Sequence, residues 1–310
     1  MLKKDTGTKC RTKLSKRTGG FNMENKNIGI IGIGVMGKSM AKNLLDAGYS
    51  VQLFTRTKSK AQSLLELGAI WKDSVSEVVK NADVVITMVG YPDDVEAVYF
   101  GENGILENAK RNAYVVDMTT SKPIIAEKIF KEASERGLFA LDAPVSGGDI
   151  GAKNGTLSIM VGGQLKAYEQ LKPIFEVMGG TIIHQGPAGS GQHTKLCNQI
   201  TIASNMVGVC ESITYAKKAG LNPERVLESI TTGAAGSFSL SNLAPRMIKH
   251  DFAPGFYVKH FIKDMTIALE SAKDMGLLTP GLALSLELYT ELAEQGEQES
   301  GTQALIKLFS

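Results

Sequence analysis

One short segment indicates the architecture of this chain: Ile28-Gly29-Ile30-Ile31-Gly32-Ile33-Gly34-Val35-Met36-Gly37-Lys38-Ser39. It begins with a β-branched run, which is typical of a strand buried on both faces of a parallel sheet. A helical pattern follows from about Met36 to Ala47 and ends at Gly48. The segment therefore predicts a strand, a glycine-rich turn and a helix in direct succession.

The glycines of this turn have the G-x-G-x-x-G spacing of a dinucleotide-binding loop. In such a loop Gly32 permits the tight turn, Gly34 lets a pyrophosphate approach the backbone, and Gly37 permits close packing of helix against strand. We expect the backbone N–H groups at the start of the helix, around Val35 and Met36, to face the phosphates.

The same residues also satisfy the phosphate-loop pattern G-x-x-x-x-G-K-S, because Lys38 and Ser39 follow Gly37. A strand over 114–117 that ends in Asp117 would then supply a magnesium-binding carboxylate. A nucleotide triphosphatase or kinase is therefore the alternative interpretation. We favour the dinucleotide site because of the residues that follow the second strand.

Those residues, Thr55-Arg56-Thr57, stand directly after the expected strand over 51–54. An NAD site usually places Asp or Glu about 20 residues beyond the glycines, where the carboxylate binds the ribose hydroxyls. Arg56 can instead pair bidentately with a 2′-phosphate and stack on adenine. The sequence predicts NADP as the preferred cofactor and NAD as the alternative, unless Arg56 is only a solvated loop cation.

Strand and helix patterns alternate through the first half of the chain, which favours parallel β-α-β units. Further strands are expected at 84–89, 114–117, 138–141, 157–161 and 181–184, and helices at 58–67, 74–80, 93–99, 123–136 and 166–178. We therefore expect an α/β, Rossmann-type doubly wound sheet over residues 26–188.

The second half, from Gly189 to residue 310, has helical periodicity and no strand-like runs. One face of its first, long helix is apolar: Leu196, Ile200, Ala203, Val207 and Cys210. Later helices are expected at 223–231, 239–249, 258–275, 281–294 and 302–308. This half is predicted to be an all-α domain for substrate binding and oligomerisation.

Residues 1–25 form a basic leader that we expect to lie outside the fold. Residues 1–20 hold seven basic side chains and one acid, a local net charge of +6 within a total of +2, so the remainder carries −4. No apolar core of a secretory signal is present in this leader. A non-native leader, or a start codon assigned too early with Met23 as the natural beginning, is favoured over a mitochondrial presequence. The expected location is therefore the cytoplasm, with the mitochondrial matrix as the alternative.

Composition narrows the classes of partner. The near-zero net charge argues against a dedicated nucleic-acid binder, and no apolar stretch reaches the ~18 residues that span a bilayer. The three cysteines and four histidines lack the spacing of a metal site, so no metal is expected. Cys197 and Cys210 are interpreted as small buried hydrophobes.

Two further segments contain chemically useful residues. Asp142-Ala143-Pro144-Val145-Ser146-Gly147-Gly148 ends in a turn whose N–H groups and hydroxyl suit a carboxylate. Lys195 lies about one turn inside the long helix, where the helix N-terminus can lower the pKa of an amine. Asn198 shares that face and can hydrogen-bond the same ligand.

Together, three motifs resemble the signatures of the β-hydroxyacid dehydrogenases: Gly-Ile-Gly-Val-Met-Gly at 32–37, Asp-Ala-Pro-Val-Ser-Gly-Gly at 142–148 and Gly-x-Gly-x-x-x-Lys-x-x-Asn at 189–198. The resemblance extends from residue 28 to about 305. It implies hydride transfer between a nicotinamide cofactor and a small 3-hydroxy acid or semialdehyde, of the 3-hydroxyisobutyrate, succinic semialdehyde or glyoxylate type. The longer 6-phosphogluconate dehydrogenases differ, because they have His between the matched Lys and Asn.

The resemblance also implies residue roles. Lys195 matches the general acid/base, Asn198 the residue that orients substrate, and Ser146–Gly148 the carboxylate-binding turn. Thr120 matches a position near the nicotinamide and the substrate, and Met88 and Val89 match the stretch beside the adenosine. A helical segment that closes over the cofactor is matched by Phe256, Lys263 and Asp264. Family members form homodimers or homotetramers through the helical domain. A non-catalytic NADP-binding module on the same scaffold is a further alternative.

Overall fold

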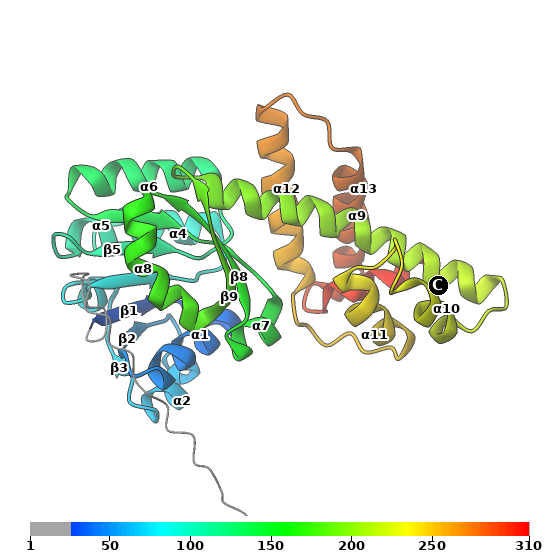
Figure 1. Cartoon of the computed structure of the whole chain (residues 1–310), viewed down its shortest axis with the longest axis horizontal. Helices are drawn as coiled ribbons and strands as arrows, with labels where there is room; N and C mark the ends of the chain where they lie inside the picture. The colour runs from blue at the N-terminus through cyan, green and yellow to red at the C-terminus, as the bar shows by residue number, and fades with distance from the viewer. Residues whose placement is uncertain (1–25, 310) are drawn as a thin grey trace, which may run out of the picture.

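The computed structural model describes residues 26–309 of the chain. The prediction of a leader over residues 1–25 lies outside the described residues. Two parts are visible in Figure 1: a sheet flanked by helices, and a set of helices that crosses a long helix, α9 (Ser190–Lys218). No helix of the described part is both long and apolar enough to cross a membrane.

The sheet has the strand order β3-β2-β1-β4-β5-β6-β8-β7, and β9 pairs with β8. Its strands are β1 (Asn27–Ile31), β2 (Ser50–Phe54), β3 (Ile70–Trp71), β4 (Val84–Thr87), β5 (Tyr114–Asp117), β6 (Phe139–Asp142), β7 (Val145–Ser146), β8 (Leu157–Gly163) and β9 (Gly179–Gly186). The strand order reverses between β1 and β4, so this is the switch point at which doubly wound sheets bind ligands.

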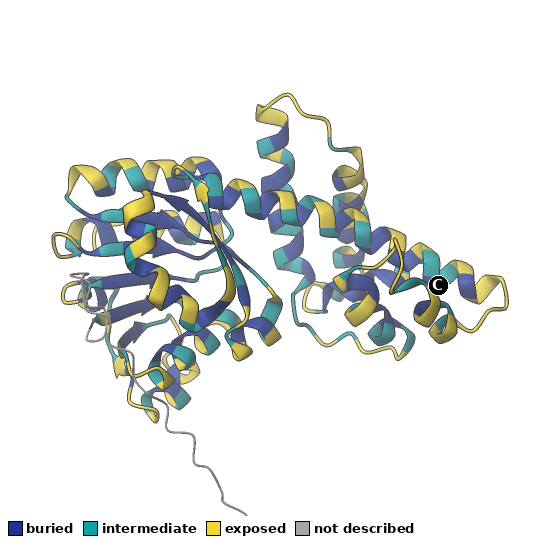
Figure 2. Cartoon of the chain, in the orientation of Figure 1, coloured by how far each residue is buried: buried dark blue, intermediate teal, exposed yellow. Residues whose placement is uncertain are grey.

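Consecutive strand residues are buried on opposite faces of the sheet. Ile30 packs in the core beside α1 (Val35–Asp46), whereas Ile31 packs in the core on the other face. The same alternation holds for Val84 and Val85. Both faces are thus covered, as Figure 2 shows by the dark strands, and this explains the uninterrupted apolar runs in the sequence.

The helices that connect these strands follow the predicted order. They are η1 (Lys58–Ala61), α2 (Gln62–Leu65), α3 (Val75–Val79), α4 (Pro92–Phe100), α5 (Ile105–Asn108), α6 (Pro123–Glu135), α7 (Gly148–Asn154) and α8 (Leu165–Met178). The expected helices at 58–67, 74–80, 93–99, 123–136 and 166–178 are confirmed, although the first is divided into a 3₁₀ turn and a short α-helix.

The expectation of parallel pairing is wrong at one edge of the sheet. β8 runs antiparallel to both β6 and β7, and only β9 is parallel to β8. The reason is that β7 continues the direction of β6, and α7 then returns the chain so that β8 runs back along both strands. The short elements β3, α5, β7 and α7 were also not predicted, because their few residues give no clear periodicity.

The second half is all helical within the described residues, apart from an isolated bridge between Tyr257 and Gly301. After α9 come α10 (Pro223–Ile230), the π-helix η2 (Ser239–Leu243), α11 (Ala244–Ile248), α12 (Val258–Asp274), α13 (Pro280–Leu292), the π-helix η3 (Ala293–Glu297) and the 3₁₀ helix η4 (Thr302–Phe309). The predicted apolar face of α9, including Leu196 and Cys210, packs in this half's own core.

α9 joins the two halves physically. Its first turns pack against β8 and β9, and its later turns pack against α12 and α13, so the helix runs from the sheet into the helical part in Figure 1. The sequence places Lys195 and Asn198 on the first turns. These side chains therefore lie where the two halves meet.

Candidate active site

The glycine loop has the geometry that its spacing predicts. Gly32 has φ of +97°, and its N–H donates to the carbonyl of Phe54 at 3.0 Å, which holds the loop against the end of β2. A Cβ on Gly32 would overlap the carbonyl oxygen of Met88, and one on Gly37 would overlap that of Gly32. Both positions therefore require glycine for close packing.

Gly34 differs from these two glycines, because a Cβ placed there would meet nothing within 4 Å. It is the N-cap of α1 and supplies no side-chain cap for the first-turn N–H groups around Val35 and Met36. An open approach to uncapped N–H groups is what a pyrophosphate needs. The loop thus fits a dinucleotide phosphate, on the evidence of its own backbone.

Arg56 lies in the segment after β2, with its side chain 84% exposed, and it forms an ion pair with Asp94 of α4 at 3.2 Å between Nη1 and Oδ1. Thr55 is half-buried and Thr57 is exposed beside it. The guanidinium is accessible to a phosphate. In the described residues it pairs with the carboxylate of Asp94, which the sequence analysis did not identify as a partner.

The carboxyl ends of the neighbouring strands are linked by hydrogen bonds. The N–H of Val89 donates to Thr119 Oγ1 at 3.0 Å, and the N–H of Thr119 donates to Asp117 Oδ1 at 3.1 Å. Burial raises the pKa of Asp117 to about 6, while the Thr87 hydroxyl donates to it at 2.8 Å. Asp117 is therefore used inside the fold, which disfavours its alternative role as a magnesium ligand.

Lys195 is the buried cation of this region, with 7% of its surface exposed. Burial lowers the pKa of Lys195 to about 8; the charge of Asp264 opposes this shift and that of Lys263 adds to it. The sequence analysis attributed such a shift to the helix N-terminus, whereas loss of hydration is the main cause. An amine with this pKa exchanges protons readily near neutral pH.

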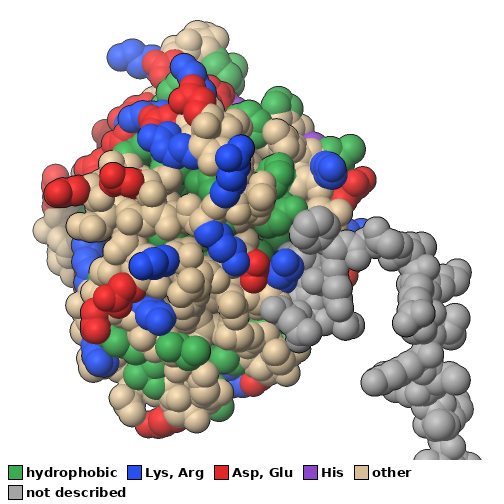
Figure 3. All heavy atoms as spheres, turned by 90° about the vertical axis from the view of Figure 1, so that its left-hand side faces the viewer, with side chains coloured by type: hydrophobic (Ala, Val, Ile, Leu, Met, Phe, Trp, Pro, Cys, Tyr) green, Lys and Arg blue, Asp and Glu red, His purple; other side chains and the backbone are tan. Residues whose placement is uncertain are grey.

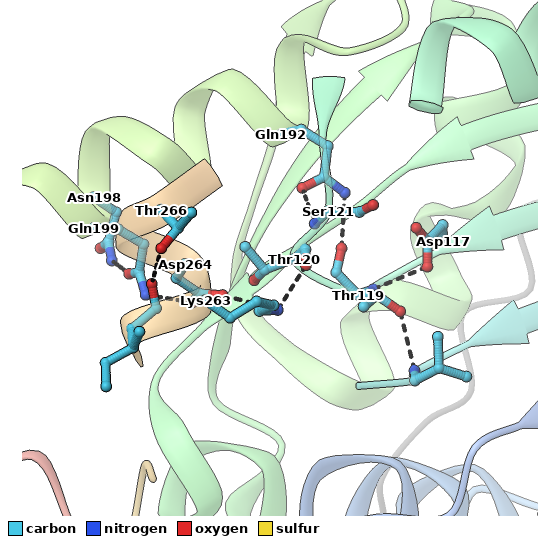
Figure 4. A network of polar contacts seen from close by, with 12 residues as sticks. Asp117, Thr119, Thr120, Ser121, Gln192, Asn198, Gln199, Lys263, Asp264 and Thr266 are labelled. Carbon is cyan, nitrogen blue, oxygen red and sulfur yellow. Dashed lines mark hydrogen bonds and ion pairs between the residues drawn. The ribbon is translucent and has the colours of Figure 1, made fainter. Parts of the chain in front are cut away.

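A continuous series of polar contacts connects the predicted residues of the two halves, most of them drawn in Figure 4. Ser146 Oγ lies 3.3 Å from Asn198 Oδ1, and Asn198 Nδ2 donates to Gln199 Oε1 at 2.7 Å. Gln199 Nε2 in turn donates to Asp264 Oδ2 at 2.6 Å. The substrate-binding turn and α9 are thereby joined to α12.

The series ends at the loop after β5. Lys263 Nζ forms an ion pair with Asp264 Oδ1 at 2.9 Å and donates to the carbonyl of Thr120 at 2.8 Å. Both side chains are largely buried. The structure therefore brings together Ser146, Asn198, Asp264, Lys263 and Thr120, which lie in four separate parts of the sequence.

The other predicted residues lie at the β7–α7 junction and in the helical part. Gly147 and Gly148 have φ of +130° and +63° and form the junction between β7 and α7. The half-buried Phe256 packs on Phe261, with ring centroids 5.6 Å apart, inside the helical part. Cys210 is buried as expected, but the prediction for Cys197 is wrong: it is exposed, because it lies on the outward face of α9.

Sequence reasoning assigned no role to several buried polar residues of this region, among them Asp142, Gln192 and Gln199. Asp142 stands at the carboxyl end of β6, where ligands and helix ends gather in such sheets, so its position was a usable signal. The two glutamines gave none, because an amide on a helix is ordinarily solvent-exposed.

Comparison with known proteins assigns both halves. Residues 27–186 match the family described as the NAD binding domain of 6-phosphogluconate dehydrogenase. Residues 189–309 match the family described as NAD-binding of NADP-dependent 3-hydroxyisobutyrate dehydrogenase. With the switch-point loop and the buried Lys195, these matches define an oxidoreductase that binds a nicotinamide dinucleotide.

The chain belongs to the β-hydroxyacid dehydrogenase family. It is 66% identical over 284 residues to an uncharacterized oxidoreductase of Bacillus subtilis, covering 92% of this chain and 99% of that protein. It is 40% identical to the 2-hydroxy-3-oxopropionate reductase of Escherichia coli, covering 90% and 96% of the two chains.

A solved structure of Mycobacterium tuberculosis 3-hydroxyisobutyrate dehydrogenase with L-serine superimposes with a TM-score of 0.84 at 30% identity, covering 92% of this chain and 99% of that one. Family membership leaves the nucleotide triphosphatase interpretation of residues 32–39 without support.

Proposed function

We propose that this protein is an NADPH-preferring reductase and dehydrogenase that interconverts small semialdehydes, or related oxo acids, with the corresponding hydroxy acids, 3-hydroxy acids among them. The observation that supports this most directly is the buried Lys195, with its pKa lowered to about 8, one turn from Asn198, whose amide oxygen contacts Ser146. Two relatives agree in class: the Escherichia coli protein is a 2-hydroxy-3-oxopropionate reductase, and the Mycobacterium tuberculosis 3-hydroxyisobutyrate dehydrogenase was solved with L-serine.

The substrate carboxylate is proposed to bind at the β7–α7 junction. Positive φ angles at Gly147 and Gly148 turn successive backbone N–H groups at the start of α7, where the partial positive charge of a helix N-terminus favours an anion. Ser146 adds a hydroxyl that can donate to the same carboxylate. A substrate held there has its oxo group directed toward α9.

Lys195 is proposed to hold the proton that is transferred. As an ammonium it donates to the carbonyl oxygen of the oxo acid, and as a neutral amine it accepts the hydroxyl proton of the hydroxy acid in the reverse direction. Asn198 orients the reacting oxygen, and its own amide is held by Gln199 at 2.7 Å. Burial excludes water from the ammonium and so keeps the proton available to substrate alone.

The residues that would hold the cofactor are the glycine loop, Val35 and Met36 for the pyrophosphate, and Met88 and Val89 beside the adenosine. Arg56, with Thr55 and Thr57, would hold the 2′-phosphate, and Thr120, Lys263 and Asp264 lie nearer the reacting end. When bound, a nicotinamide dinucleotide supplies or accepts the hydride of this chemistry. Preference for NADPH rests on Arg56, which replaces the carboxylate usual in NAD sites.

The decisive experiment is a panel of C2–C5 semialdehydes and hydroxy acids assayed with NADPH and NADH. Lys195→Ala should lower kcat by about 100-fold or more, the usual contribution of a positioned proton donor. Binding of NADPH, measured by fluorescence titration, should be unchanged. The matched control is Lys217→Ala, at the exposed far end of α9, which should retain full activity.

Two outcomes would contradict the proposal. Lys195→Ala with wild-type activity would remove the mechanism, and NADPH binding without turnover of any substrate would favour a non-catalytic binding module.

A small carboxylate-bearing substrate is the proposed partner, without nucleic acid or membrane. Figure 3 shows Lys and Arg mixed with Asp and Glu on one face of the sheet part. The proposed location is the cytoplasm, as expected for a protein similar to bacterial oxidoreductases.

A further inference from the structure

Gln192 joins α9 to the loop that follows β5. Its side chain is completely buried. Nε2 donates to the carbonyl of Thr119 at 2.7 Å, and Oε1 accepts the N–H of Ser121 at 2.9 Å. One amide therefore brackets Thr120 on both sides, as Figure 4 shows.

The backbone of Gln192 is fixed as well. Its N–H donates to Asp142 Oδ2 at 2.8 Å, and the N–H of Gly189 donates to Asp142 Oδ1 at 2.9 Å. The carboxylate of a strand end thus caps α9, whose own N-cap, Gly189, offers no side chain. A Cβ on Gly191 would overlap the carbonyl oxygen of Met160, so the helix start is pressed against β8.

Two groups of the proposed reaction meet through this amide. Lys195 follows Gln192 by three residues and lies on the same side of α9. The bracketed Thr120 offers its carbonyl to Lys263, the neighbour of Asp264 on α12. Gln192 is therefore the side chain that links the helix bearing the proton donor to the loop facing the substrate.

We propose that Gln192 is a positioning residue: its amide fixes the distance between Lys195 and the Thr119–Ser121 loop without touching substrate. This inference rests on the proposed function. The physical reason is that, among the described residues, no other side chain of α9 hydrogen-bonds to residues 119–121. The two backbone groups that Gln192 binds are also buried. Without the amide these groups lack partners, so the loop must move to reach water.

Such a movement should affect turnover more than binding. A displacement of about 1 Å between reacting groups can lower a rate by about 100-fold, whereas the phosphate and carboxylate contacts lie on other elements. We therefore expect a loss of kcat by about 10- to 100-fold. KM for substrate and Kd for NADPH should stay within about threefold of wild type.

The test compares Gln192→Met with Gln303→Met. Methionine keeps the length and volume of the side chain and removes both hydrogen bonds. Gln303 is a matched control, because it is also buried and its Nε2 also brackets backbone, donating to the carbonyls of Asp251 and Ala253 at 3.0 and 3.1 Å in the helical part. Gln303→Met should lower Tm by a similar amount and leave kcat within twofold.

A second measurement does not depend on activity. Hydrogen exchange at residues 119–121 and 190–195 should be faster in Gln192→Met than in wild type, and unchanged in Gln303→Met. If the wild-type protein turned over no substrate, the proposed function would fail while exchange still tested the link. Where Gln192→Met does not fold, Gln192→Glu replaces it: the carboxylate keeps the acceptor for Ser121, whereas the donor to Thr119 is replaced by an oxygen that repels the Thr119 carbonyl.

The inference is overturned if kcat of the Gln192 variant stays within twofold of wild type. It is also overturned if both glutamine variants lose kcat in proportion to their Tm, since a general loss of stability would then explain the effect. Unchanged exchange at residues 119–121 would likewise contradict it.

Discussion

Among single residues, Lys195 shows how burial changes the pKa of a common side chain, here in the direction that the proposed proton transfer needs. An exposed lysine has a pKa near 10.4 and would be almost fully protonated in use. Loss of hydration lowers the pKa of Lys195 to about 8, and the neighbouring charges of Asp264 and Lys263 act in opposite directions. Both protonation states are thus accessible in the physiological range.

This shift predicts opposite pH dependences for the two directions of the reaction. Reduction needs the ammonium, so its kcat/KM should be level below pH 8 and fall about tenfold per unit above it. Oxidation needs the neutral amine, so its kcat/KM should rise with pH and level off above about 8. Initial rates between pH 5.5 and 10 measure both profiles. A single turning point near 10 in either direction would show that the amine behaves as an exposed lysine.

A further single-residue prediction concerns Arg56 and the choice between NADPH and NADH. Arg56→Ala should raise Kd for NADPH by about 10- to 100-fold, the size of a charge-assisted contact to phosphate, and change Kd for NADH by less than about threefold. Lys60→Ala is the control, because it removes an exposed cation of the same segment without the guanidinium fork. Equal losses for both cofactors would mean that Arg56 does not contact a 2′-phosphate.

Among the elements, the turn between β1 and α1 separates stability from binding within one motif. Gly37 faces the carbonyl oxygen of Gly32, whereas Gly34 faces open space. The three glycines of the turn are alike in sequence. Their surroundings differ: Gly32 and Gly37 allow close packing of the backbone, whereas Gly34 leaves space in which a pyrophosphate could approach.

Two substitutions test this division. Gly37→Ala should lower the free energy of unfolding by about 3 kcal/mol, as expected for overpacking against backbone that cannot yield. Gly34→Ala should lower it by about 1 kcal/mol or less, the cost of alanine at an N-cap, but raise Kd for NADPH at least about tenfold. Denaturant titration and fluorescence titration measure the two effects. Normal NADPH binding by Gly34→Ala would refute the assigned approach of the pyrophosphate.

Hydrophobic periodicity predicts the long elements of this chain but not the short ones. Long runs such as those of α6 and α9 were predicted from the sequence, because each buries a stripe over several turns. β7 and α7 were not, since a two-residue strand and a seven-residue helix contain too few positions. Their omission explains why the direction of β8 was predicted wrongly.

For the whole molecule, the oligomeric state is still a prediction. The apolar face of α9 packs in this chain's own core, so it does not supply a surface for a second subunit. Exposed apolar side chains lie instead in the loop between α12 and α13, at Met275, Leu277 and Leu278, the last with 89% of its surface exposed. Clustered exposed hydrophobes commonly mark a protein interface.

We therefore expect a homodimer or homotetramer in which this loop is covered by a second copy. Leu278→Asp should shift the protein toward the monomer in sedimentation velocity runs at micromolar concentration, because an interfacial charge would be buried unpaired. Leu165→Asp, at another exposed leucine, in the sheet part, should leave the assembly unchanged. A wild-type protein that is monomeric at every concentration would exclude this arrangement.

The sequence alone determined the α/β half, the helical half and the glycine loop, because these follow from local periodicity and from motifs of adjacent residues. It also supplied candidate residues for the site, whose roles stay predictions. It did not reveal Asp142, Gln192 or Gln199, nor that Arg56 pairs with Asp94. Those contacts join residues 38 to 73 positions apart or lie on helix faces whose burial no local pattern records. Only the packing of α9 between the two halves buries Lys195, and burial is what gives its amine a pKa suited to the proposed chemistry.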